Sequence, residues 1–315
     1  MAEWLYEAGI GESRAALVED GRILEAAIEL DDAGPRVGAV LRARLADRGP
    51  PAIVMLDGGS EAMLVRLPPG LSQGAALLVT VTREAIPEPG RAKRTKAEPA
   101  SSDAAPAAGP DLLARIAATG AAVRRLRAHE ADALEAAGWS ELLDEALTGE
   151  IAFAGGALRM TPTPAMTLFD VDGPTPPTPL ALAAAPAVAE AIRRHGIGGS
   201  IGIDFPTVAG REPRQAVAAA LDAALPPPFE RTAVNGFGFL QIVRPRPRAS
   251  LPELLRVDPM GAEARAALRR LERVPPGAPR RHRLPAAVLA RIAAQPDWLA
   301  DLARRTGATP DLESD

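Results

Sequence analysis

Short runs in which apolar and polar residues alternate dominate the first 86 residues. Residues 14–30 contain two such runs on either side of Glu19-Asp20-Gly21, which predicts a β-hairpin. Further β-type runs between residues 36 and 86 are separated by turns rich in Gly, Pro and Asp. Closely spaced short strands are typical of a small barrel, and we expect an OB-type fold here.

The periodicity changes after the barrel. From Asp111 the apolar residues recur with a spacing near 3.6, which predicts a helix reaching to about residue 138 and a second at Ser140–Leu147. Two strands are expected next, at Ile151–Phe153 and Ala157–Met160.

Strands and helices alternate beyond residue 164. An apolar strand in AMTLFDVDG (165–173) leads into a helix at Leu180–His195, and a second apolar strand lies in SIGIDFP (200–206). A helix at Arg214–Leu225 and a strand at Phe237–Val243 follow. This βαβαβ pattern predicts an α/β sheet. Residues 262–274 and Ala286–Arg305 are expected to be helical as well.

The fold class that we predict is therefore α/β, or α+β overall. The expected segments are opening strands of the core at 1–35, an S1-like OB barrel at 36–87, a flexible linker at 88–110, an α/β catalytic core at 111–250 and a small basic helical region at 251–315.

Composition limits the chemistry that the chain can carry. The 315 residues include no cysteine, so any metal must be held by oxygen or imidazole ligands, which favours Mg2+ or Mn2+. The net charge is only −4, but residues 231–296 hold 13 Arg against 4 acidic residues. Such a segment attracts a polyanion, although a general preference for Arg gives the same count. Without a signal peptide or an apolar stretch of membrane-spanning length, we expect a cytoplasmic protein with no membrane partner.

Two aspartates end the apolar strands of the alternating region. Asp170 and Asp204 follow buried-type runs, and ligand sites of α/β sheets gather at the carboxyl ends of strands. Paired carboxylates suit Mg2+, which lowers the pKa of a bound water. Asp172 shares the face of Asp170, as a third ligand or to orient the water. The alternative is that these residues are ordinary helix caps or turn formers.

The same region resembles the catalytic core of the ribonuclease E/G family. The resemblance is carried by TPTPAMTLFDVDG, IGGSIGIDF, PRQAV and NGFGFLQIVRPR. It implies that Asp170 and Asp204 bind the Mg2+ that drives hydrolysis of single-stranded RNA, and that Asp172 stands where the family has Asn. It also implies that the hairpin at 14–30 corresponds to the family's opening strands and 36–86 to its inserted S1 domain.

The chain departs from the family pattern in several places. The strands AIVML and AMLVRL carry no aromatic residue, Gly236 replaces an Arg, and the 5′-monophosphate sensor has no counterpart. Because the cysteine link is absent, no zinc-linked tetramer is expected, and we expect a monomer or dimer.

Four residues are candidates for RNA binding. Arg244, Arg246 and Arg248 alternate along an extended run and either bind phosphate or protect a sheet edge; the resemblance favours phosphate. Asn235 either contacts RNA or forms a turn before Gly236. His195 has no partner for a catalytic or zinc arrangement, and we expect it to face solvent.

Three functions are compatible with these patterns. The first is a metal-dependent endoribonuclease that cleaves single-stranded RNA with a Mg2+-activated water. The second is a catalytically weak or inactive RNA-binding protein of the same fold. The third is a protein-interaction module with no role in nucleic-acid binding.

Overall fold

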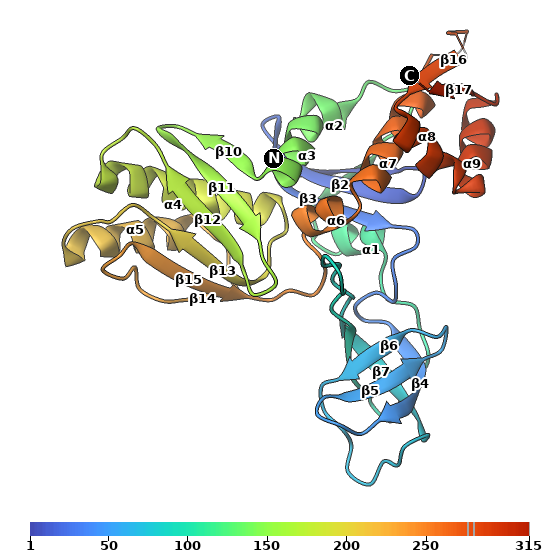
Figure 1. Cartoon of the computed structure of the whole chain (residues 1–315), viewed down its shortest axis with the longest axis horizontal. Coiled ribbons are helices and arrows are strands. Elements are labelled where there is room, and N and C mark those ends of the chain that lie inside the picture. The colour runs from blue at the N-terminus through green and yellow to red at the C-terminus, as the bar shows by residue number, and fades with distance from the viewer. Residues whose placement is uncertain (276, 280, 315) are drawn as a thin grey trace. The chain divides into compact units, whose positions relative to one another are not determined.

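The computed structural model describes residues 1–275, 277–279 and 281–314. The chain forms two compact units, each discontinuous in sequence, and Figure 1 labels most of their elements. Unit 1 combines Met1–Ala33, Leu112–Leu143 and Leu255–Asp315, and unit 2 combines Gly34–Asp111 with Asp144–Leu254. Helices and strands occur in both units, so the chain is α+β. The opening strands thus belong with the C-terminal region, and not with the sheet that bears Asp170 and Asp204.

A four-stranded sheet forms the centre of unit 1. Its order is β3-β2-β1-β9, with β1 (Glu3–Ala8), β2 (Glu12–Glu19), β3 (Arg22–Leu30) and β9 (Ala122–Arg125). The β2–β3 pair confirms the predicted hairpin. Strand β9 runs parallel to β1.

The long helix predicted after Asp111 is wrong. Only α1 (Leu112–Ala117) and the short α2 (Ala133–Ala136) form there, with β9 between them. Gly120 adopts a positive φ of 81°, which ends the helical path. Pairing with β1 then outweighs the helix propensity of the Ala- and Arg-rich sequence. The next helix, α3 (Trp139–Thr148), is confirmed.

The C-terminal region is helical, as predicted, but also contains two short strands. The stretch expected as one helix at Ala286–Arg305 is broken because Pro296 starts a new helix. The elements are α6 (Leu251–Val257), α7 (Pro259–Glu272), β16 (Arg281–Leu284), α8 (Ala286–Ala293), α9 (Pro296–Thr306) and β17 (Asp311–Ser314).

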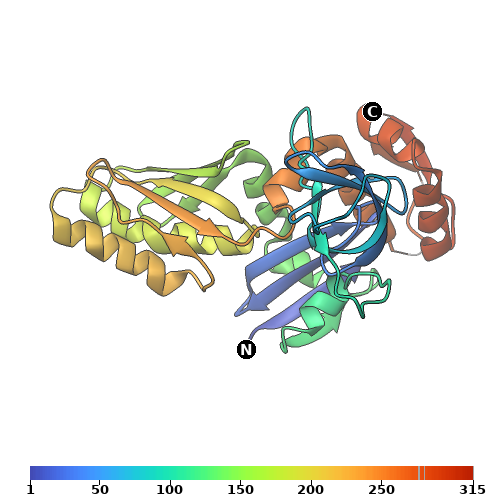
Figure 2. The same cartoon turned by 90° about the horizontal axis from the view of Figure 1, so that it is seen from below.

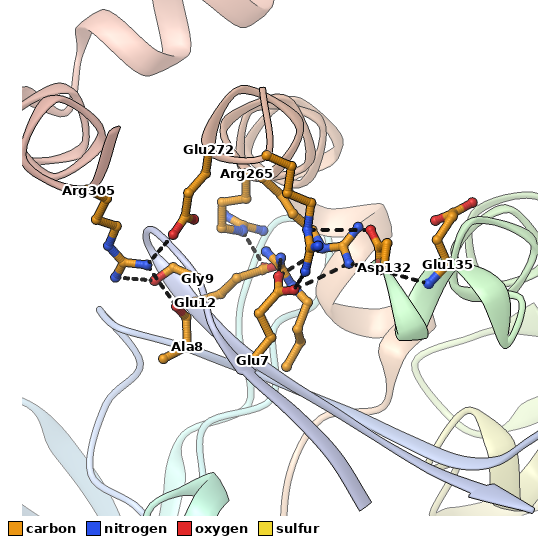
Figure 3. Close-up of polar contacts among 12 residues, drawn as sticks. Glu7, Ala8, Gly9, Glu12, Asp132, Glu135, Arg265, Glu272 and Arg305 are labelled. Carbon is orange, nitrogen blue, oxygen red and sulfur yellow. Dashed lines mark hydrogen bonds and ion pairs between the residues drawn. The ribbon is translucent and has the colours of Figure 1, made fainter. Parts of the chain in front are cut away.

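A buried ionic network joins α7 to the sheet of unit 1. Glu7 and Arg14 lie directly opposite one another on β1 and β2, and Arg14 Nη1 donates to Glu7 at 2.5 Å. Arg14 also donates to Glu12 from Nε at 3.0 Å and from Nη2 at 2.6 Å. In Figure 3 Glu7 and Glu12 point from the sheet toward the helix that bears Arg265. The side chains of Glu7, Glu12, Arg14 and Arg265 are all buried.

Three arginines of α7 and its C-cap complete this network. Arg265, Arg269 and Arg273 are spaced four residues apart and therefore share one side of the helix. Arg265 Nε donates to Glu12 at 2.8 Å, and Arg269 Nε donates to Glu7 at 2.8 Å. Arg273 also donates to Glu7. These three arginines belong to the basic segment 231–296, from which polyanion binding was predicted. In the structure they are paired with carboxylates of the same unit.

The first part of unit 2 is a closed five-stranded barrel. Its order is β4-β5-β6-β8-β7, and β6–β8 is the parallel pair. The barrel is OB-like, as the sequence predicts. Its strands are β4 (Val40–Asp47), β5 (Ala52–Leu56), β6 (Glu61–Leu64), β7 (Ala76–Arg83) and β8 (Thr95–Pro99).

Strand β8 corrects the predicted linker at 88–110. Thr95 and Ala97 point into the barrel and are buried, and β8 pairs with both β6 and β7. The stretch therefore closes the barrel, which cannot be complete at residue 87. Lys96, which was expected on a mobile tether, lies within this strand.

The second part of unit 2 is a six-stranded sheet with the order β10-β11-β12-β13-β15-β14. The β12–α4–β13 crossover gives a parallel pair, whereas β15 pairs antiparallel with β13. The elements are β10 (Glu150–Phe153), β11 (Gly156–Pro162), β12 (Thr167–Asp172), α4 (Pro177–Arg194), β13 (Gly199–Asp204), α5 (Arg211–Ala224), β14 (Glu230–Arg231) and β15 (Phe239–Arg244).

Helices α4 and α5 lie along the same side of this sheet (Figures 1 and 2). The core beneath them takes alternate residues of the strands, including Phe169, Val171, Ile201 and Ile203. Because side chains alternate across a strand, the residues between these point to the other face. That face, which we call the open face, carries Asp170 and its neighbours. Within the described ranges, no helix has the length and apolarity needed to cross a membrane.

We predict that Glu7→Gln destabilises unit 1 by about 3–5 kcal/mol, because it removes a buried negative charge that Arg14, Arg269 and Arg273 share. The three tryptophans of the sequence, Trp4, Trp139 and Trp298, all lie in unit 1. Urea denaturation followed by tryptophan fluorescence therefore reports on this unit. The control is Glu263→Gln at an exposed position of α7, with an expected change within about 0.5 kcal/mol. Equal loss in both variants would contradict a special role for Glu7.

We also predict that acid destabilises unit 1. Burial alone raises the pKa of Glu7, but Arg14, Arg269 and Arg273 outweigh it and hold the pKa below its ordinary value of 4.5. A carboxyl whose pKa is lower in the folded state stabilises the fold at neutral pH and loses this effect as pH falls below about 4.5. The urea midpoint of the wild type should fall over that window, and the fall should be smaller in Glu7→Gln. The same fall in both proteins would contradict the assignment.

Candidate metal centre

Asp170 and Asp204 lie side by side on the open face. They are directly opposite one another in the parallel β12–β13 pair, and both are exposed. Neighbouring strands are about 4.8 Å apart, so the two carboxylates can reach one common ion. Thirty-four positions separate them in sequence, and the crossover through α4 brings them together. The structure thus has the convergence that the strand-end pattern predicts.

The charges around Asp170 repel one another. Partial loss of hydration is the first cause that raises the pKa of Asp170 above its ordinary 3.8, and the negative charges of Asp172 and Asp204 add to it. Arg159 acts in the opposite direction. A divalent cation between the carboxylates would relieve this repulsion, and carboxylate oxygens with several waters are the donors that Mg2+ accepts. The residues present therefore fit such an ion.

Asp172 lies on the same face as Asp170, as predicted from its spacing. It is two residues further along β12, which is about 6.6 Å along a strand. Among the described residues, no group of three or more His, Cys, Asp or Glu side chains is arranged to hold one metal ion. The geometry therefore supports a pair of ligands, and of the two roles predicted for Asp172 it favours orienting a water.

An arginine borders the carboxylate pair on the next strand. Arg159 of β11 lies directly opposite Asp170, and its Nε donates to Glu150 of β10 at 3.0 Å. Arg159, Asp170 and Asp204 thus form one row across the open face. The sequence offered no signal for Arg159, because only the register of β11 brings it beside Asp170.

Two of the arginines predicted to bind RNA phosphates are engaged elsewhere. Arg244 pairs with Gly199 at the opposite end of β13 from Asp204, which is five residues or about 17 Å along the strand. Arg246 donates to Glu253, and Arg248 Nε lies 3.7 Å from Glu84. These arginines do not converge on the carboxylate pair, so their role in binding phosphate stays a prediction without geometric support.

Asn235 forms a turn beside the carboxylates. Its Oδ1 accepts hydrogen bonds from the backbone N–H groups of Phe237 at 2.9 Å and Phe239 at 3.0 Å. This oxygen is therefore occupied, and the geometry favours the turn over the alternative role of contacting RNA. His195 is fully buried and its Nε2 lies 3.1 Å from Glu145, so the expectation that it faces solvent is wrong.

Two aromatic residues in or next to β15 were not among the predicted site residues. Phe239 lies directly opposite Asp204 on β15, and Phe237, in the preceding turn, is 84% exposed. The signal was present in NGFGFLQIV, where Phe239 shares a face with every second residue of the strand. That Phe239 lies opposite Asp204 could not be predicted from the sequence, because it depends on the register of β13 and β15.

No protein-family model matches the chain, and no curated protein matches it either. The resemblance to the ribonuclease E/G family therefore stays a prediction based on the motifs.

We predict that Asp204→Asn lowers the pKa of Asp170, because it removes one of the negative charges that raise it. Carboxyl-carbon NMR titration of Asp170 measures the shift. Asp222→Asn on α5, where Asp222 pairs with Arg231, is the control and should leave the pKa of Asp170 unchanged. A pKa of Asp170 that does not fall in Asp204→Asn would contradict the proximity of the two groups.

Proposed function

We propose that the chain is a shortened relative of the ribonuclease E/G family and a metal-dependent endoribonuclease acting on single-stranded RNA. The observation that carries the proposal is the pairing of Asp170 with Asp204 on the open face. Helices cover the opposite face, and both carboxylates are exposed, so they are accessible to a polymer.

In this proposal Asp170 and Asp204 would hold Mg2+, with Mn2+ as a substitute. The bound ion would supply charge neutralisation at the phosphodiester and would make a water more acidic. The oxygen of the attacking water forms a bond to phosphorus while the P–O3′ bond breaks. The products that the resemblance implies are a 5′-phosphate, which keeps the water oxygen, and a 3′-hydroxyl, whose oxygen gains a proton.

The neighbouring residues have supporting roles in this proposal. Asp172 faces the same side and can accept a hydrogen bond from the attacking water, which orients it toward phosphorus. Arg159 offsets part of the local negative charge, since it lies opposite Asp170. Both roles need only side chains on the open face.

The alternative is an RNA-binding protein of the same fold that does not cleave. The observations that favour it are the absence of a three-ligand group in the described part of the chain and the pairing of Arg246 with Glu253. It predicts RNA binding with a steep salt dependence and no product.

Cleavage of an A/U-rich single-stranded RNA with Mg2+ tests the proposal. We predict that Asp170→Asn and Asp204→Asn each lower kcat/KM by more than the roughly 100-fold that loss of an outer-shell metal partner causes. Glu190→Gln is a matched control, because it changes an exposed carboxylate on α4, the helix that covers the other face. Cleavage at the wild-type rate by Asp204→Asn would exclude the metal role, and binding without any product would favour the alternative.

A further inference from the structure

An apolar side chain lies next to the carboxylate pair on the open face. Phe239 is directly opposite Asp204, so its side chain emerges on the same face as the carboxylate pair. Directly opposite residues of an antiparallel pair have Cα atoms about 4.5–5.5 Å apart. Phe239 and Asp204 are therefore direct cross-strand neighbours on this face.

Gly202 provides the space that this ring occupies. A Cβ atom at Gly202 would lie 2.7 Å from Cζ of Phe239 and 2.8 Å from Cδ2 of Leu168. The ring thus lies over the backbone of β13 and beside Leu168, and is only partly buried there. Any larger residue at position 202 would displace it.

The turn that carries the second aromatic is fixed to the strand that bears Asp204. Gly238 has a positive φ of 98°, and a Cβ atom there would lie 2.2 Å from the carbonyl oxygen of Phe205. The backbone of the turn is therefore packed directly against the residue that follows Asp204. Asn235 Oδ1 holds the N–H groups of Phe237 and Phe239. The backbone at both aromatics and the ring of Phe239 are therefore held in place before any ligand binds.

Phe237 projects from this turn with 84% of its surface exposed. An exposed aromatic side chain gains free energy when a flat apolar group covers it. The carboxylate pair next to Phe239 repels a phosphate unless a cation is present, whereas an uncharged nucleobase can approach the ring directly.

We propose that Phe237 and Phe239 hold unstacked bases of single-stranded RNA beside the Asp170–Asp204 pair. This inference rests on the proposed function, because the bases that it assigns to the two phenylalanines are those next to the phosphodiester bound at the carboxylates. The barrel strands lack aromatic residues, and the two phenylalanines place base stacking at the carboxylate pair. They bind and position the RNA, and take no part in the proton transfers.

Binding of a 5′-fluorescein-labelled A/U-rich RNA to the full chain, measured by anisotropy in EDTA, tests this inference. Phe239→Ala should weaken binding roughly 5- to 100-fold, the range that base–aromatic stacking gives. Phe239→Leu, which keeps apolar volume without a ring, should also bind the RNA more weakly. The affinity of Phe239→Tyr should stay within about twofold of the wild-type value. Phe237→Ala should also bind the RNA more weakly than the wild type.

Two controls separate stacking from a general loss of structure. Val243→Ala changes an exposed apolar residue on the same strand and face, opposite Ser200 and away from Asp204, and should leave binding unchanged. RNAs with one abasic nucleotide, scanned along the sequence, should include one for which wild type and Phe239→Ala bind equally. A wild type that binds no RNA, or a Phe239→Leu variant that binds every RNA as the wild type does, would overturn the inference.

Cleavage assays with Mg2+ distinguish failure of this inference from failure of the proposed function. Binding that depends on Phe239 without any cleavage would support the stacking role and refute the nuclease. Cleavage that requires Asp204 but is unchanged in Phe237→Ala and Phe239→Ala, in both kcat and KM, would support the nuclease and refute the stacking role.

Discussion

The parallel pairing of β12 with β13 brings two negative charges to neighbouring positions of a sheet. Asp170 and Asp204 repel one another there, and the pKa of Asp170 rises above its ordinary value through burial and the charges of Asp172 and Asp204. The core on the other face supplies the free energy that holds the pair in place, because Phe169 and Ile203 precede the aspartates and are fully buried. If one of these strands slipped by one residue against the other, the carboxylate on the shifted strand would turn into that core and the pair would be lost. The site therefore depends on the register of a single strand pair.

In unit 1 the buried carboxylates are paired with arginines. Its carboxylates at Glu7 and Glu12 are buried against arginines of β2 and α7, so the charges compensate one another within the protein. Gly9 contributes, since a Cβ atom there would lie 2.9 Å from Nη2 of Arg14. A cluster satisfied in this way links the N-terminal strands to a helix near the end of the chain. These compensated carboxylates contrast with Asp170 and Asp204, which Arg159 offsets only in part. That contrast is the main reason why we propose the metal site at Asp170 and Asp204.

Much of the fold could be predicted from local patterns, and the failures have physical causes. The hairpin, the barrel and the β12–α4–β13 crossover follow from alternation and apolar runs. Strand β8 was missed because its inward positions are only Thr95 and Ala97, too small to stand out among Pro, Ala and charge. Strand β9 was missed because Ala and Arg favour helix locally, and only pairing with β1 makes the segment extended.

The candidate site was predictable only in part for a related reason. A strand-end Asp can be recognised in sequence, but its cross-strand neighbours Arg159 and Phe239 depend on register. Composition was misleading about the basic C-terminal region, because Arg265, Arg269 and Arg273 are spaced to meet carboxylates on β1 and β2. A count of arginines does not distinguish a surface for RNA from an internal ionic network.

The most direct test of this account is the location of a bound divalent cation. Paramagnetic broadening by Mn2+ in amide NMR spectra reports the residues nearest to the ion, and excess Mg2+ should reverse it. The account predicts broadening centred on Asp170 and Asp204, which disappears in the Asp170→Asn and Asp204→Asn variants. Broadening centred elsewhere, or unchanged in both variants, would contradict it.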